Sequence, residues 1–166
     1  LTHQLQAFLK DVFLSQNLIN PKLVLGLSGG LDSVVLLHLL ADSNKTLPFK
    51  LSAHHIHHGL SPNADAWASF CADYCSKLNV PLKVSKVKVS KNSGLGIESA
   101  ARNARYQVLL NDDAELICVA HHQDDQAETL LLQLARGAGI KGLASMGAVS
   151  KFPISLLRPL LNVSRC

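Results

Sequence analysis

Long hydrophobic runs, a secretory leader and an initiating methionine are all lacking from this chain. No apolar stretch approaches the roughly 18 residues that cross a bilayer. The first residues have neither the basic flank nor the apolar core of a signal peptide. We therefore expect a cytoplasmic protein without membrane association, and the missing methionine indicates a fragment of a longer chain.

Closely paired cysteines are lacking as well. The first two of the four cysteines, Cys71 and Cys75, are four residues apart, so a helix places both thiols on one face. A CxxC motif for redox chemistry or metal binding has its two cysteines three residues apart instead. We expect reduced, mostly buried thiols at these positions and at Cys118 and Cys166.

Arginine is lacking from the first hundred residues, in which lysine supplies all the permanent positive side-chain charge. The net charge of +4 permits an RNA partner but does not require one. The arginines all come later: Arg102, Arg105, Arg136, Arg158 and Arg165. Because a planar guanidinium suits phosphate and carboxylate groups, we expect anions to bind the later part of the chain.

Hydrophobic residues make up 48% of the chain and charged residues 17%, which favours a single folded domain over residues 1–166. The expected strands cover 23–27, 49–56, 81–89, 116–120 and part of 152–161. The expected helices cover 32–41, the segment after Ser61 with Pro62 just inside it, 98–110 and 125–136. This alternation predicts an α/β fold with an open, mostly parallel, Rossmann-like sheet and helices on both faces. Such sheets bind ligands at the carboxyl ends of their strands.

The first candidate site is the loop Ser28-Gly29-Gly30-Leu31-Asp32-Ser33, where an expected strand meets an expected helix. Two glycines followed by a helix start are typical of an anion nest. The loop is neither a Walker A motif nor a GxGxxG fingerprint. Asp32 would repel a bound phosphate unless a divalent cation such as Mg²⁺ lies between them. The alternative is an ordinary strand-to-helix turn with Asp32 near the N-cap.

The second candidate site, His121-His122-Gln123-Asp124-Asp125-Gln126-Ala127-Glu128, directly follows an expected strand. Paired carboxylates at the carboxyl end of a strand suit a metal-assisted reaction on a phosphate or a carbonyl group. The structural alternative is a capping box formed by Asp125 and Glu128.

Two further clusters are open to two interpretations each. The histidines of His54-His55-Ile56-His57-His58 make zinc an alternative, but they alternate across a strand and no cysteine lies at ligand spacing. Glu98, Arg102 and Arg105 lie on neighbouring turns of one expected helix face. They form either a solvated ion pair or an anion clamp.

Taken together, these blocks resemble the N-type ATP pyrophosphatases of the PP-loop superfamily, whose SGGxDS loop is Ser28 to Ser33 here. Within that group the chain is similar to the tRNA(Ile)-lysidine synthetases. The similar segments are Ala53 to Ser61, Gly96 to Tyr106, Ala120 to Thr129, Arg136 to Leu143 and Arg158 to Leu161. The chain departs from the family at His57, where Asn is frequent, and at Ser61, where Arg is frequent.

The resemblance implies an adenine-nucleotide α-hydrolase-like fold with ATP and Mg²⁺ as cofactors. It implies L-lysine and an isoleucine tRNA with a CAU anticodon as substrates. The C2 carbonyl oxygen of the wobble cytidine would be adenylated with release of pyrophosphate, and the lysine ε-amine would then displace AMP. We expect a homodimer, and we expect the C-terminal tRNA-binding domains of the family to lie outside this chain.

The resemblance also implies residue roles. Nucleotide binding is expected of Ser28, Gly29, Gly30, Leu31, Asp32, Ser33 and His55. Catalysis is expected of Asp32, Arg102, Asp125 and Glu128, with Asp32 and Asp125 as ligands of Mg²⁺. Substrate contact is expected of Arg105, His122 and Arg136.

Three rival functions are weaker on the sequence. A tRNA-thiolating relative would need CxxC pairs, which the chain lacks. A non-catalytic ATP-binding module does not explain the acidic residues Asp32, Asp124 and Asp125. A metal phosphohydrolase built on a His-Asp run is usually all-helical, whereas strands are expected here.

Overall fold

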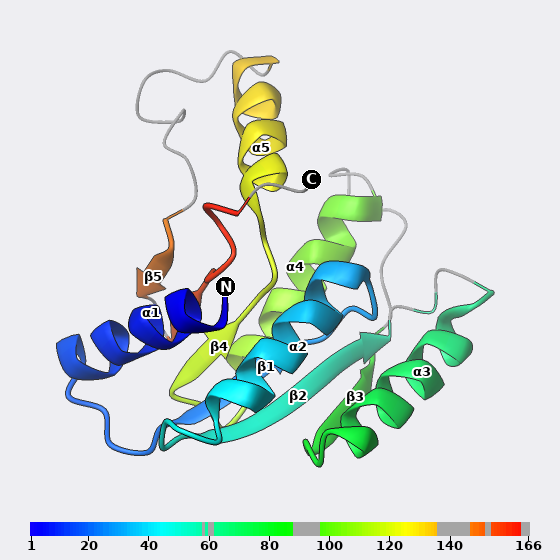
Figure 1. Ribbon diagram of the computed structural model, residues 1–166. Helices are drawn as coiled ribbons and strands as arrows, with labels where there is room; N and C mark the ends of the chain where they lie inside the picture. Colours follow the sequence, from blue (N-terminus) through cyan, green and yellow to red (C-terminus); the bar gives the residue numbers. More distant parts are fainter. Residues whose placement is uncertain (58, 60–61, 88–96, 136–146, 152–153, 164–166) are drawn as a thin grey trace.

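The computed structural model describes residues 1–57, 59, 62–87, 97–135, 147–151 and 154–163, which form six strands and five helices (Figure 1). The strands are β1 (Lys22–Gly26), β2 (Lys50–His57), β3 (Leu82–Lys86), β4 (Leu116–Cys118), β5 (Val149–Lys151) and β6 (Ser155–Leu157). The helices are α1 (Thr2–Ser15), α2 (Leu31–Ser43), α3 (Ala64–Lys77), α4 (Ile97–Leu110) and α5 (Gln123–Ala135).

The strands form one sheet in the order β3-β2-β1-β4-β6-β5. Every neighbouring pair is parallel except β5 and β6, which are antiparallel at one edge. The chain runs outward from β1 through β2 to β3 and then returns to β4 on the other side of β1. This reversal is the topological switch point, where open α/β sheets bind their ligands beyond the carboxyl ends of the strands.

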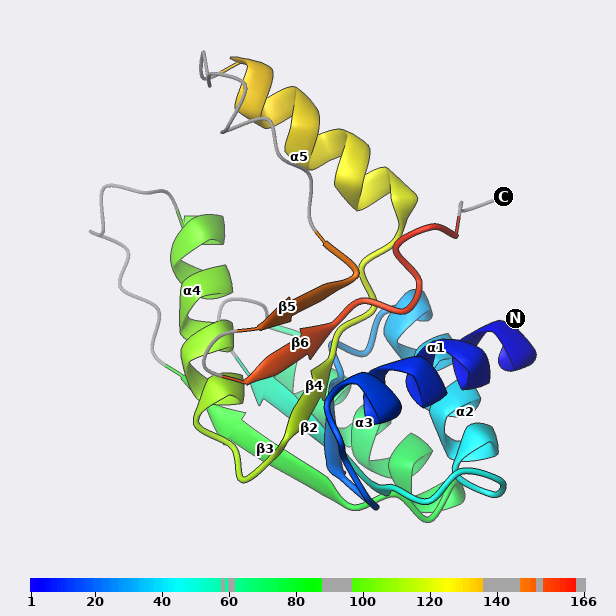
Figure 2. The same ribbon diagram turned by 90° about the vertical axis from the view of Figure 1, so that its left-hand side faces the viewer.

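Helices cover both faces of the sheet, as Figure 2 shows for α1 and α2 on one side and α4 on the other. Alternate residues of β1 explain this: Leu23 and Leu25 join the core under α1, α2 and α3, whereas Val24 packs with Leu109 of α4. In both views α5 extends beyond the sheet. No helix in the described part of the chain is long and apolar enough to span a membrane.

The predicted architecture is confirmed, and each predicted strand and helix has a counterpart. One detail is wrong: Pro62 lies ahead of α3, whose first residue is Ala64 and whose N-cap is Asn63. Cys71, Cys75 and Cys118 are free and buried, as predicted. Cys166 and the ends of several predicted elements lie outside the described residues.

Two elements were not anticipated, α1 and the short antiparallel β5. Helix α1 buries Leu5, Leu9, Val12 and Phe13, whose spacing places them on one helical face. This face packs on α2 and the sheet and becomes part of the larger core.

A buried polar cluster ties the turn after α4 to β2 and β3. The His54 side chain is 1% exposed; its Nδ1 pairs with the Asp112 carboxylate, and its Nε2 lies 2.8 Å from Ser85 Oγ. Lys83 Nζ donates to the same carboxylate. The neighbouring Asp113 is 90% exposed and pairs with a lysine at the surface.

We expect Asp112→Ala to lower the free energy of unfolding by roughly 1.5–3 kcal/mol, because it removes a charged hydrogen-bond partner from a buried imidazole. Urea unfolding monitored by circular dichroism measures this. The matched variant Asp113→Ala should unfold like the wild type, since exposed ion pairs contribute little. Equal effects of the two substitutions would contradict the role given to Asp112.

Candidate active site

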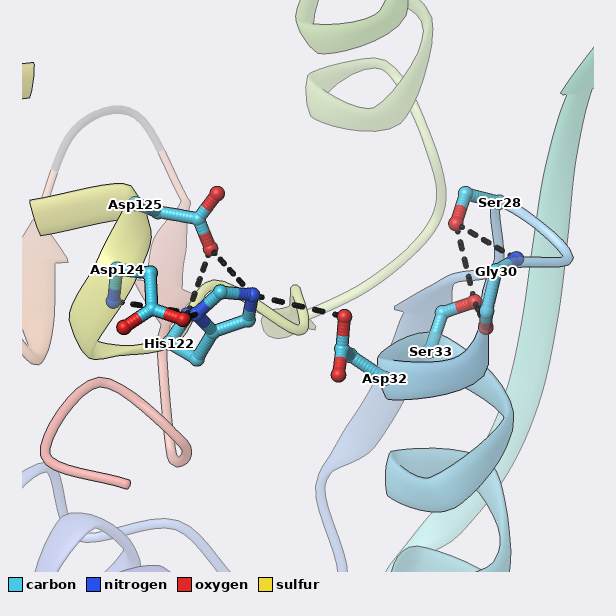
Figure 3. Close-up of polar contacts among 7 residues, drawn as sticks. All are labelled: Ser28, Gly30, Asp32, Ser33, His122, Asp124 and Asp125. Carbon is cyan, nitrogen blue, oxygen red and sulfur yellow. Dashed lines mark hydrogen bonds and ion pairs between the residues drawn. The ribbon is translucent and has the colours of Figure 1, made fainter. Parts of the chain in front are cut away.

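The loop after β1 is held in shape by its own serines (Figure 3). The Gly30 N–H donates to Ser28 Oγ at 3.2 Å, and Ser33 Oγ donates to the Gly30 carbonyl at 2.8 Å. The two serine oxygens lie 3.0 Å apart, and because the Ser33 proton is directed to Gly30, Ser28 donates to Ser33. The loop is therefore fixed by the side chains of its own two serines.

The N–H groups at the start of α2 are the groups predicted to bind an anion. Gly30 is the N-cap of α2; its backbone is extended, and as a glycine it has no side chain with which to cap the first turn. Uncapped N–H groups at a helix start carry partial positive charge and bind phosphate. Gly29 has a φ of +85°, and a Cβ there would lie 3.3 Å from Cys71 Sγ on α3, so this position requires glycine. The glycine conformation and the helix start expected of an anion nest are both found here, and Asp32 lies in the first turn of α2.

Across the switch point, the His122 imidazole lies among three carboxylates (Figure 3). Its Nε2 is 3.6 Å from Asp32 Oδ2 and 3.5 Å from Asp125 Oδ2, and its Nδ1 is 3.7 Å from Asp124 Oδ2. The sheet thus brings together the two predicted sites, which are about ninety residues apart in the sequence. Asp32 and Asp125 therefore lie close to the same nitrogen of the His122 imidazole ring.

Helix α5 begins at Gln123, two residues earlier than predicted, because His122 caps it. Asp125 Oδ2 accepts the His122 N–H at 2.8 Å, and the Asp124 N–H donates to His122 Nδ1 at 3.2 Å. This is a reciprocal capping box. The alternative capping box of Asp125 with Glu128 is therefore wrong. Asp125 is the third helical residue, whose side chain accepts from the N-cap His122, and Glu128 is exposed one turn later.

A cavity of about 670 Å³ opens between the two sites, a size typical of pockets for small ligands. The predicted residues that line it are Ser28, Gly30, Asp32, Ser33, His55, Arg105, His122 and Asp125. Arg102 is not among the lining residues; it is exposed and lies over the Tyr106 ring at 5.6 Å. Arg105, half-buried on the same helix, forms the cavity wall in its place. Arg136 lies outside the described residues.

His55 is buried in this wall with its ring orientation fixed. Its Nδ1 lies 2.8 Å from the Leu27 carbonyl and therefore carries the proton. Burial lowers the pKa of His55, partly offset by the bond to Leu27. The ring is neutral and leaves Nε2 as an acceptor.

His121 lines the cavity too, although no role of its own was predicted for it within the second candidate site. Burial lowers its pKa to about 4, and the positive charge of Arg102 adds to this, whereas Asp125 opposes it. Its Nδ1 is buried, and no hydrogen-bond partner for it is found among the described residues. The sequence shows the histidine beside His122 but cannot show that it lacks a partner.

We expect the free energy of unfolding to fall as the pH drops from 6.5 toward 4, because the unfolded chain protonates His121 before the folded protein does. With about 1.4 kcal/mol per pKa unit, less screening by solvent, the loss is roughly 2 kcal/mol. Urea unfolding across this pH range measures it. A His121→Asn variant should have a flatter profile, and an unchanged profile would show that this residue does not cause the loss.

Fold and site define an α/β nucleotide-binding protein, with a phosphate loop at the switch point of the sheet and carboxylates facing it. The PP-loop domain family matches residues 1–166, the whole chain. The chain therefore belongs to the PP-loop family.

Curated relatives narrow the comparison. The chain is 54% identical to the tRNA(Ile)-lysidine synthase of Chromobacterium violaceum over 143 residues, which cover 84% of this chain and 33% of that protein. It is 52% identical to the tRNA(Ile)-lysidine synthase of Neisseria meningitidis serogroup B over 159 residues, which cover 95% of this chain and 37% of that protein. The chain spans about a third of the length of these relatives.

Solved structures support the fold alone, since their sequence identity is low. The U34-tRNA thiolase NcsA from Methanococcus maripaludis has a TM-score of 0.79 at 22% identity, covering 98% of this chain and 59% of that chain. The NH3-dependent NAD synthetase from Campylobacter jejuni has a TM-score of 0.59 at 18% identity, covering 99% of this chain and 67% of that chain.

Proposed function

We propose that this chain is the catalytic domain of an enzyme that ligates L-lysine to the wobble cytidine of a CAU-anticodon isoleucine tRNA, with cleavage of ATP to AMP and pyrophosphate. One observation carries the proposal. The PP-loop, with Asp32, faces His122 and Asp125 across one cavity. The chain is also 52–54% identical to the two tRNA(Ile)-lysidine synthases compared above. The tRNA-binding parts of the enzyme and its assembly as a homodimer belong to the same proposal.

Mg²⁺ fits this site. Asp32 and Asp125 would hold it, because their carboxylates face each other beside the phosphate loop. In the described part of the chain, no three His, Cys, Asp or Glu side chains form a metal site. This agrees with an ion that takes most of its ligands from water and phosphate. When bound, the ion would neutralise charge on the phosphates.

The chain's own residues account for the two steps. The N–H groups after Ser28 hold the pyrophosphate portion of ATP, so the C2 oxygen of cytidine attacks the α-phosphorus and pyrophosphate leaves into the loop. The lysine ε-amine then attacks C2 and AMP leaves with the oxygen. Asp125 and Asp32 are the carboxylates placed to bind the amine and accept its proton.

The test uses the full-length protein with Mg-ATP, labelled lysine and an unmodified isoleucine tRNA transcript. We expect label in the tRNA with equal amounts of AMP and pyrophosphate. ATP cleavage to AMP without label would assign the domain to another acceptor. ATP binding without cleavage would leave a nucleotide-binding module and would contradict the proposal. Light scattering of the same protein tests the homodimer.

A further inference from the structure

Two polar atoms at neighbouring strand ends are buried without a partner. In the described part of the chain, three buried side-chain polar atoms have no hydrogen-bond partner: Ser43 Oγ, His121 Nδ1 and Arg158 Nε. Ser43 lies in the last turn of α2, far along that helix from the loop. His121 follows β4 and Arg158 follows β6, two strands that pair in parallel. The coincidence of two unsatisfied groups at the carboxyl ends of neighbouring strands points to a ligand, since buried polar groups are rarely left unpaired.

Arg158 is a buried cation without a carboxylate. Its side chain is enclosed, with the residue 8% exposed, and Nη1 donates to the Gly147 carbonyl at 2.7 Å and to Ser150 Oγ at 2.9 Å. Both acceptors are neutral, and among the described residues no ion pair to Arg158 is formed. Burying an uncompensated charge is costly, so an anion is expected beside this guanidinium.

The register of the sheet places Arg158 opposite Val119, two residues before His121. Cys118 of β4 is paired with Leu157 of β6, and the Val119 N–H donates to the Leu157 carbonyl at 3.0 Å. Arg158 is the next residue, and its charge is one of those that lower the pKa of His121. The His121 ring is neutral, so a ligand at this edge meets a guanidinium donor and an imidazole.

We propose that His121 and Arg158 form a subsite for the α-amino-acid head group of the amine substrate. Arg158 donates to the α-carboxylate, and the α-ammonium group donates to His121 Nδ1. This inference rests on the proposed function, which it extends from the reacting amine to the other end of lysine.

A phosphate fits the pair less well than an amino acid does. A phosphate dianion carries no proton to donate, so it would satisfy Arg158 and leave His121 Nδ1 without a partner. The phosphate loop also belongs to β1, two strands and about 10 Å away across the sheet. The next residue after His121 is His122, which contacts Asp32 and Asp125. A lysine anchored at Arg158 therefore has its side chain available to run toward these carboxylates.

The test compares four amines as substrates of the full-length protein. L-lysine has both head groups, L-lysinamide lacks the carboxylate, 6-aminohexanoate lacks the α-ammonium group, and n-pentylamine lacks both. For the wild type we expect kcat/KM to fall about 30-fold or more from lysine to lysinamide. In Arg158→Gln this ratio should approach one, and in Arg158→Lys it should be intermediate. His121→Phe should instead remove the preference for lysine over 6-aminohexanoate.

The adenylation step serves as the folding control, because pyrophosphate release on ATP and tRNA does not need the amine. We expect Arg158→Gln to retain this release while its KM for lysine rises. Equal losses for lysine and lysinamide in Arg158→Gln would overturn the subsite and leave the proposed function standing. A wild-type protein that transfers none of the four amines would contradict the proposed function itself.

Discussion

Replacing Asp32 or Asp125 with asparagine is expected to slow ATP cleavage by about 10²–10³-fold, the effect typical of losing one preorganised electrostatic group. Both carboxylates lie within 3.6 Å of His122 Nε2 at the mouth of the phosphate loop. The fold should survive. In Asp125→Asn the amide oxygen still accepts the His122 N–H, so the cap of α5 is kept while the negative charge is lost.

Pyrophosphate release, measured with tRNA and Mg-ATP, gives the rate, and thermal unfolding gives the folding control. The matched variant is Asp42→Asn, at the far end of α2 from Asp32, where the carboxylate is half exposed and pairs with Lys45. It should cleave ATP at the wild-type rate. Near-normal cleavage in both Asp32→Asn and Asp125→Asn would place the reaction elsewhere.

The largest effect on stability is expected for Leu9→Ala, which should lower the free energy of unfolding by about 2–5 kcal/mol. Leu9 is fully buried where α1 packs on α2 and the sheet. Because domains of this size are stable by only about 5–15 kcal/mol, the variant should unfold at a much lower urea concentration.

Leu14→Ala on the same helix is the control, since Leu14 is 76% exposed. Its unfolding midpoint should match that of the wild type in the same urea titration. If Leu9→Ala were equally harmless, α1 would not be part of the core of the domain.

The local parts of the molecule were predictable from the sequence. The loop from Ser28 to Ser33 can be recognised in the sequence because all the residues that form it are adjacent along the chain. The strands and helices from β1 to α5 were predicted in the right order, since their apolar patterns are continuous, although the starts of α3 and α5 were misplaced. The spacing of Leu5, Leu9 and Val12 in α1 is equally visible, although the expected elements began only at residue 23.

The tertiary parts were not predictable. The three-residue strand β5 forms by pairing with β6, and its own sequence has no apolar pattern that predicts a strand. The start of α5 was misplaced because histidine is an unusual cap residue and its partner Asp125 had been assigned the cap itself. The exchange of Arg102 for Arg105 in the cavity wall depends on how α4 is rotated against the sheet. Arg158 was named only among the later arginines and in the family resemblance, because its lack of a counter-ion exists only in the folded chain.

The central claim is that the PP-loop site activates a cytidine oxygen with AMP. The most direct measurement uses isoleucine tRNA whose wobble cytidine carries ¹⁸O at C2, incubated with the full-length protein, Mg-ATP and lysine. Mass spectrometry of the released nucleotide then locates the label. Our account predicts one ¹⁸O atom in the phosphate of AMP. AMP without ¹⁸O, formed together with lysine-modified tRNA, would show that the C2 oxygen leaves by another route and would contradict the account.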